Sequence, residues 1–115
     1  MNKIFLILVF ISSSYAFVSE DKERYEVLGP GLSECGEVVE AAEKGLVSPR
    51  YLVFVAYAQG VITTLNATSS YIYDEQLNFA PKFPTLSRVI KNYCNENLLD
   101  VFHESVVTLW VENAK

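Results

Sequence analysis

Hydrophobic residues recur at helical spacing in four stretches of the chain, and this pattern predicts an all-α fold. The first stretch begins near Ser33, a residue type that caps helices, and stops before Gly45. Its hydrophobic residues fall at i, i+3, i+4 and i+7 and form one stripe: Cys35, Val38, Val39 and Ala42. Glutamates lie beside this stripe. We therefore expect a short first helix in which Cys35 faces the core.

A second helix is predicted to start at Pro49 and to contain the apolar run from Arg50 to Leu65. Ser48-Pro49 is a typical helix start, because a capping residue precedes a proline in the first turn. The stretch YLVFVAYAQGVITTL is apolar nearly all round, which is typical of a buried helix. Its β-branched and aromatic residues also suit a strand, but the length and the Ser-Pro start favour a helix. Gly60, in its second half, would let a neighbouring helix approach closely.

An irregular stretch from Asn66 to Pro84 is predicted to follow. Loops of this length often form binding surfaces, and tyrosine is frequent at protein interfaces. We therefore take four residues of this stretch as a candidate partner-binding patch: Tyr71, Tyr73, Asp74 and Glu75. The alternative is a solvated loop whose tyrosines partly cover the core.

Two further amphipathic helices complete the predicted core. The third opens at Pro84-Thr85, and the fourth ends near Asn113. Their inner faces are expected to carry Leu86, Val89, Ile90, Tyr93 and Cys94, and then Phe102, Val106, Leu109 and Trp110. The fold class expected from these patterns is a small four-helix single domain over residues 33–113. An extended lead-in over residues 17–32 precedes it.

The N-terminal residues have the pattern of a secretory signal peptide. Lys3 gives a positive start, IFLILVFI is an apolar run, and Ser14 and Ala16 are the small residues of a cleavage site after Ala16. The apolar run is far shorter than the roughly 20 residues of a spanning helix. We expect residues 1–16 to be removed, leaving a periplasmic or secreted protein without a stable membrane anchor. The alternatives are an N-terminal anchor or a buried helix.

The net charge and the cysteine content exclude some classes of partner and of chemistry. Loss of Lys3 leaves 8 basic and 14 acidic residues, a net charge of −6, which argues against nucleic acid as a partner. The two cysteines of an exported chain predict one disulfide, Cys35–Cys94, between the first and third helices. Closing a loop that long stabilises a fold by about 4 kcal/mol. Glu34 and Glu37 beside Cys35 argue against a reactive thiol.

The sequence offers no pattern typical of a catalytic centre. His103 is the only histidine, and we expect it on the surface, turned away from the stripe that contains Phe102. A metal site needs three or four converging ligands, and a catalytic triad needs a suitably placed serine as well. We therefore expect a protein that is not an enzyme and uses no metal or cofactor. Asn66 begins an Asn-Ala-Thr sequon, and whether it is modified is left open.

The order of these segments resembles the small periplasmic proteins grouped with the HdeA acid-stress chaperones. The resemblance rests on GPGLSECGEV, YAQGVITTLN and RVIKNYCNENLLD. The family's cysteine positions match Cys35 and Cys94, its helix glycine matches Gly60 and its asparagine matches Asn66, whereas Leu98 replaces a proline. The resemblance implies a non-enzymatic protein that self-associates at neutral pH and binds unfolded proteins in acid.

The same order also resembles the Rap/Tai-type immunity proteins of type VI secretion, small secreted helical proteins that neutralise a toxin in the periplasm. Their central helix also carries a glycine, and a loop and a helix similar to PTLSRVIKNY follow it. They usually contain more than two cysteines. This resemblance implies a preformed surface for one toxin or enzyme, with the segment Tyr71–Glu75 as the candidate. On either resemblance the partner is another protein, and homodimer formation stays open.

Overall fold

The computed structural model describes residues 25–115, so the expected signal peptide and the first part of the lead-in lie outside the described residues. Four α-helices and one 3-10 turn follow one another, without a β-sheet in this part of the chain. The elements are η1 (Gly29–Leu32), α2 (Cys35–Glu43), α3 (Pro49–Tyr71), α4 (Phe83–Glu96) and α5 (Phe102–Asn113). The predicted all-α, four-helix fold is therefore confirmed. No helix within residues 25–115 is both long enough and apolar enough to cross a membrane.

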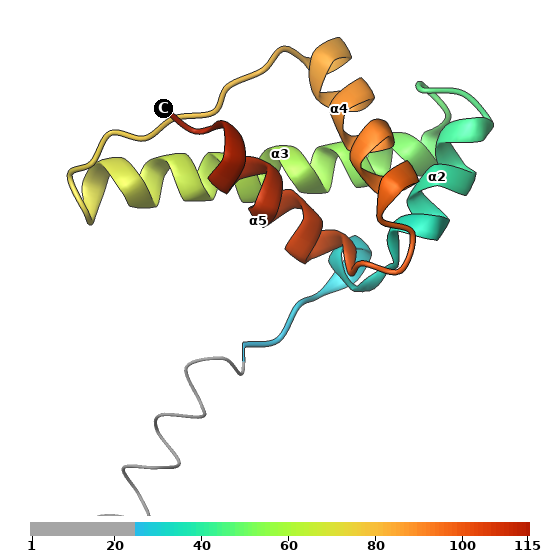
Figure 1. The fold of residues 1–115 in the computed structure, drawn as a ribbon, viewed down its shortest axis with the longest axis horizontal. Coiled ribbons are helices and arrows are strands. Elements are labelled where there is room, and N and C mark those ends of the chain that lie inside the picture. The colour runs from blue at the N-terminus through green and yellow to red at the C-terminus, as the bar shows by residue number, and fades with distance from the viewer. Residues whose placement is uncertain (1–24) are drawn as a thin grey trace, which may run out of the picture.

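Helix α3 is the longest element and the support for the others (Figure 1). It begins at Pro49, directly after Ser48, as the sequence predicted. It ends at Tyr71 rather than at Leu65, so the irregular stretch is shorter than expected. Helices α2 and α4 lie beside its N-terminal half, and α5 crosses its middle (Figure 1).

Only one face of α3 is buried, so the prediction of a helix enclosed on all sides is wrong. The buried residues are Tyr51, Phe54, Val55, Ala58, Ile62 and Ser69. On the other face, Leu52 and Val53 are 37% and 53% exposed. A Cβ added at Gly60 would meet nothing within 4 Å, so no neighbouring helix of this chain uses the close approach that the glycine allows. The described chain has too few helices to surround α3.

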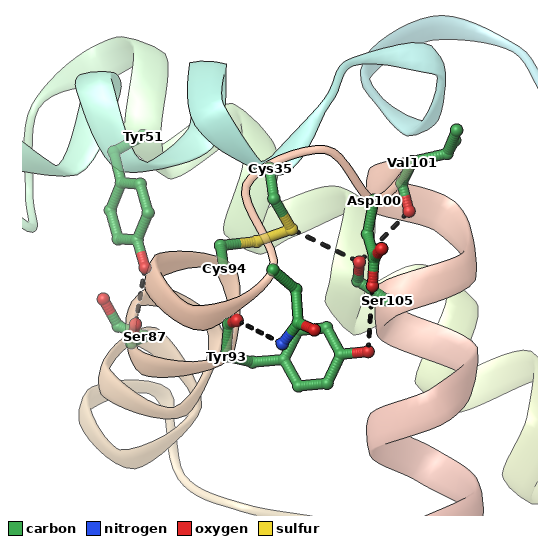
Figure 2. The surroundings of a disulfide bond; sticks show 9 residues. Cys35, Tyr51, Ser87, Tyr93, Cys94, Asp100, Val101 and Ser105 are labelled. Carbon is green, nitrogen blue, oxygen red and sulfur yellow. Dashed lines mark hydrogen bonds between the residues drawn. A yellow bond between two sulfur atoms is a disulfide. The ribbon is translucent and has the colours of Figure 1, made fainter.

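The Cys35–Cys94 disulfide joins the first turn of α2 to the end of α4 and confirms the predicted pairing (Figure 2). Both cysteines are fully buried. The Cys35 Sγ atom also lies 3.3 Å from the Oγ of Ser105 on α5. The disulfide therefore lies where three helices meet, and it joins α2 to α4 beside α5.

The end of the expected lead-in is not extended. Gly29–Leu32 form η1, which packs against α3 and α5. The packing is tight, because a Cβ added at Gly31 would collide with the hydroxyl of Tyr57. The start of α2 is not capped by the Ser33 side chain as expected; instead the Cys35 N–H donates to the carbonyl of Asp100 at 2.8 Å.

Candidate binding surface

The segment between α3 and α4, residues 72–82, is tied to the rest of the fold by hydrogen bonds. Ser69, which is buried near the end of α3, accepts the Leu77 N–H at its Oγ (2.9 Å) and the Glu75 N–H at its carbonyl (3.1 Å). Asn78 and Lys115 exchange two backbone hydrogen bonds of 3.2 and 3.1 Å. The segment is therefore positioned both by α3 and by the residues that follow α5.

Asn66 is the second anchor of this segment. Its amide nitrogen donates to the Phe79 carbonyl at 3.0 Å, and its Oδ1 accepts the Phe79 N–H at 3.0 Å. The same Oδ1 accepts the indole N–H of Trp110 at 2.7 Å. One side chain of α3 thus holds both the segment and a side chain of α5. A glycan on this half-buried amide would displace contacts that the fold uses.

The residues Tyr71–Glu75, which we call the tip, project at the far end of α3 beyond α5 (Figure 1). Tyr71, Ile72 and Tyr73 are 87%, 70% and 67% exposed. Tyr71 was expected in the loop, but it is the last residue of α3, because the helix runs on past Leu65.

The backbone in and directly after the tip has an unusual local conformation. Asp74 and Gln76 have φ angles of 52° and 55°, in the left-handed region that residues other than glycine rarely adopt. Such residues persist where surrounding contacts hold them, and they concentrate at binding sites. The hydrogen bonds that the Glu75 and Leu77 N–H groups donate to Ser69 provide those contacts here. The tip is therefore a shaped turn with three large side chains directed to solvent.

A pocket of about 310 Å³ lies between the tip, α3 and α5. We call it the aromatic pocket. It is lined by Leu65, Thr68, Ser69, Tyr73, Glu75, Leu77 and Trp110. Two of the four candidate residues, Tyr73 and Glu75, therefore meet in one site, whereas Tyr71 and Asp74 lie outside its lining. Trp110 was placed on an inner helix face by its spacing, and no local signal connected it with a residue 44 positions earlier.

A larger depression of about 490 Å³ runs between α3 and α5. This α3–α5 groove is lined by Ala56, Tyr57, Gly60, Val61, Thr64, Leu65, His103 and Val107. The stretch from Tyr51 to Tyr73 contains no charged residue. The Thr63 and Thr64 hydroxyls donate back to the carbonyls four residues earlier in the same helix, at 2.7 and 2.9 Å. The groove is consequently apolar along most of its length.

His103 does not stand on the open surface, so that prediction is wrong. Its Nδ1 lies 2.7 Å from the hydroxyl of Tyr57, and the ring of Tyr25 meets it edge-on with centroids 5.8 Å apart. Partial burial and the nearby Tyr25 raise the pKa of Tyr57. Tyr57 and His103 both line the α3–α5 groove. His103 is covered because η1 and α3 pack against α5, on the face that helical spacing predicted to be exposed to solvent.

Within residues 25–115, no three His, Cys, Asp or Glu side chains come together in a way that could hold a metal ion. Comparison of the chain with protein-family models, curated proteins and solved structures finds no match. The resemblances to the HdeA-type and Rap/Tai-type proteins therefore stay predictions, and the described surfaces themselves are the basis for a proposed function.

Proposed function

We propose that the protein is a non-enzymatic protein-binding protein that presents the tip to one protein partner, in the manner of an inhibitor or immunity protein. The observation that carries this proposal is the row of three exposed side chains, Tyr71 to Tyr73, on a turn held by hydrogen bonds. Tyrosines are enriched among the residues that dominate binding energies. A backbone that is already ordered also lowers the entropy cost of association.

The proposed place of action is the periplasm or the exterior of the cell. The disulfide supports it, because disulfides persist mainly in oxidising compartments. The signal-peptide pattern of residues 1–16 points to the same compartment. Removal of that segment is part of the proposal.

A second candidate function is the binding of unfolded proteins in acid, as the HdeA resemblance implies. The α3–α5 groove favours it, because an uncharged helix face beside an apolar depression suits apolar segments of many sequences. Acid would protonate the 14 carboxyl groups and make the net charge positive. The two candidates use different surfaces, the tip and the groove, so substitutions separate them.

The experiment is affinity capture from periplasmic extract with the exported, purified protein at pH 7 and near pH 3. The test variant is Tyr71→Ser/Tyr73→Ser. The matched control is Leu99→Ser, which also removes an exposed apolar side chain (83% exposed) but lies in the turn before α5. We expect one dominant protein at pH 7 that the control retains and the tip variant loses.

Other outcomes of the capture experiment decide against this proposal. Many unrelated proteins, retained only near pH 3 and equally by the tip variant, would favour the acid-dependent chaperone. One dominant protein that the tip variant still retains would place the binding surface elsewhere. An empty capture at both pH values would leave both candidate functions without support.

A further inference from the structure

The lining of the aromatic pocket combines three kinds of group that suit a cation on a long stem. Tyr73 and Trp110 supply aromatic rings, and Glu75 supplies a carboxylate. Cations are attracted to the faces of tryptophan and tyrosine rings, most strongly where water is excluded. Leu65 and Leu77 add apolar surface, which matches the methylene stem of a lysine or arginine side chain.

Charge around the pocket also favours a cation. Glu75 lines it and Asp74 precedes that residue, while α3 brings no charged residue after Arg50. The basic residues on the adjoining segments are Lys82 and Lys115, and neither belongs to the lining. An apolar side chain in the same place would take the Glu75 carboxylate out of water without pairing it, which is unfavourable. A guanidinium or ammonium group would pair it.

Most of the pocket is in place before any ligand binds. The Trp110 indole is fixed by its hydrogen bond to Asn66, and Ser69 fixes the backbone at Glu75 and Leu77. Tyr73 belongs both to the tip and to the pocket wall, and it is still 67% exposed. A volume of about 310 Å³ lies at the lower end of the ~300–1,000 Å³ of small-molecule sites. It therefore suits a single side chain.

We propose that the aromatic pocket binds a lysine or arginine side chain of the protein that docks on the tip, between the rings of Tyr73 and Trp110 and beside the Glu75 carboxylate. This inference rests on the proposed function, because it identifies one chemical feature of that partner. Contacts made at the tip by Tyr71 and Ile72 would flank the inserted cation. Recognition of the partner then depends on a basic residue at the centre of its docking surface.

A titration with small cations tests the pocket without the partner. Trp110 is the only tryptophan, so its indole signal in a ¹H–¹⁵N correlation spectrum reports directly on one wall of the pocket. The probes are N-acetylarginine methylamide and N-acetyllysine methylamide. N-acetylcitrulline methylamide is the control probe, because it has nearly the shape of the arginine compound without the charge. We expect saturable shifts with both cations, with dissociation constants in the millimolar range, and about tenfold weaker binding of the citrulline compound.

Two variants link these shifts to the carboxylate. Glu75→Gln is expected to weaken binding of the arginine compound by about fivefold or more. Glu104→Gln is the matched control, since it removes an exposed carboxylate from α5 outside the pocket, and it is expected to leave binding unchanged. Equal shifts with the arginine and citrulline compounds would overturn the proposal, and so would the absence of any shift or an unaltered affinity in Glu75→Gln.

The capture experiment and the titration fail independently. Tip-dependent capture of one protein without cation binding would keep the proposed function and refute the pocket as a cation site. Cation binding together with tip-independent capture would keep the cation site and refute docking of a protein on the tip. If both hold, Glu75→Gln is expected to weaken capture of the same protein, and undiminished capture would show that the partner's cation does not enter this pocket.

Discussion

Replacement of Asn66 by alanine tests whether one side chain holds the tip and the aromatic pocket in place. The substitution removes three hydrogen bonds, two to the backbone of Phe79 and one to the Trp110 indole. At about 0.5–1.5 kcal/mol each, they amount to roughly 1.5–4.5 kcal/mol. Alanine returns about 0.6 kcal/mol through its higher helix propensity. Because the site is only partly buried, water satisfies some of the released groups, and we expect a net loss near 2 kcal/mol.

The assay is urea unfolding at pH 7, followed by tryptophan fluorescence and by helical circular dichroism. For a slope of about 1 kcal/mol per molar urea, the expected loss lowers the unfolding midpoint by about 2 M. Asn92→Ala is the matched control, because Asn92 is exposed on α4 and makes no side-chain hydrogen bond to residues 25–115. It gains the same helix propensity without losing a contact. Asn66→Asp keeps the acceptor but places a carboxylate oxygen against the Phe79 carbonyl, so it should also be less stable than Asn92→Ala.

The reasoning is refuted if Asn66→Ala and Asn92→Ala unfold within about 0.5 kcal/mol of each other, which is less than one ordinary hydrogen bond contributes. A second readout is binding of the arginine compound, which Asn66→Ala should weaken because the indole is no longer held. Unchanged binding would show that other contacts position Trp110.

Three further predictions concern other parts of the fold. Reduction of the Cys35–Cys94 disulfide, which spans a sequence separation of 59, should lower the free energy of unfolding by about 4 kcal/mol, and equal urea midpoints with and without dithiothreitol would contradict this. Gly31→Ala should lower the melting temperature, because the added Cβ collides with the hydroxyl of Tyr57. Gly60→Ala has open space around it and should stabilise α3 by up to ~1 kcal/mol. A melting temperature higher for Gly31→Ala than for Gly60→Ala would refute the packing described. Burial, as the largest cause, raises the pKa of Tyr51 above its ordinary 10.0, so its contribution to stability is complete below pH 10 and is lost as the pH rises from there through the folded-state pKa. Unfolding free energies measured above pH 10 should therefore fall less steeply in Tyr51→Phe, and an identical slope would exclude this tyrosine as the cause.

Local sequence signals were sufficient for the fold class and for most helix positions. The Ser48-Pro49 pair and the spacing of residues around Cys35 and Cys94 depend on neighbours within two helical turns, so they can be read without knowing the tertiary structure. The disulfide could be predicted because a chain with two cysteines allows only one intramolecular pair. These predictions were confirmed because local and tertiary preferences agree at those positions.

The end of α3 could not be predicted in the same way. The stretch Asn66–Tyr71 is rich in residues of modest helix propensity, so local preferences place the helix end near Leu65. The helix continues because Asn66 and Ser69 bond to the returning segment from helical positions, and those partners are 13 and 8 residues away. Tertiary hydrogen bonds override a weak local preference here.

The sites were harder to predict than the helices, because each is built from residues that are distant in the chain. Helical spacing gives His103 an outward direction, but Tyr57, 46 positions earlier, covers it. Spacing likewise gives Trp110 an inward direction, yet that side chain is also a wall of the aromatic pocket. The tyrosine-rich tip was identifiable from composition alone, whereas its pocket required the crossing of α3 and α5.

The position of the tip explains why polar side chains, rather than a hydrophobic core, give it shape. The tip lies beyond the disulfide-linked core, where too few apolar neighbours exist to fix a turn by packing alone. Asn66 and Ser69 supply directional bonds from the partly buried side of α3, so Tyr71 and Tyr73 need not contact the core at all. If the tip is the partner-binding surface, as we propose, the residues that contact the partner are not the residues that hold the tip in shape. Substitutions of the exposed tyrosines should change binding at constant stability, whereas substitutions of the anchors should change both.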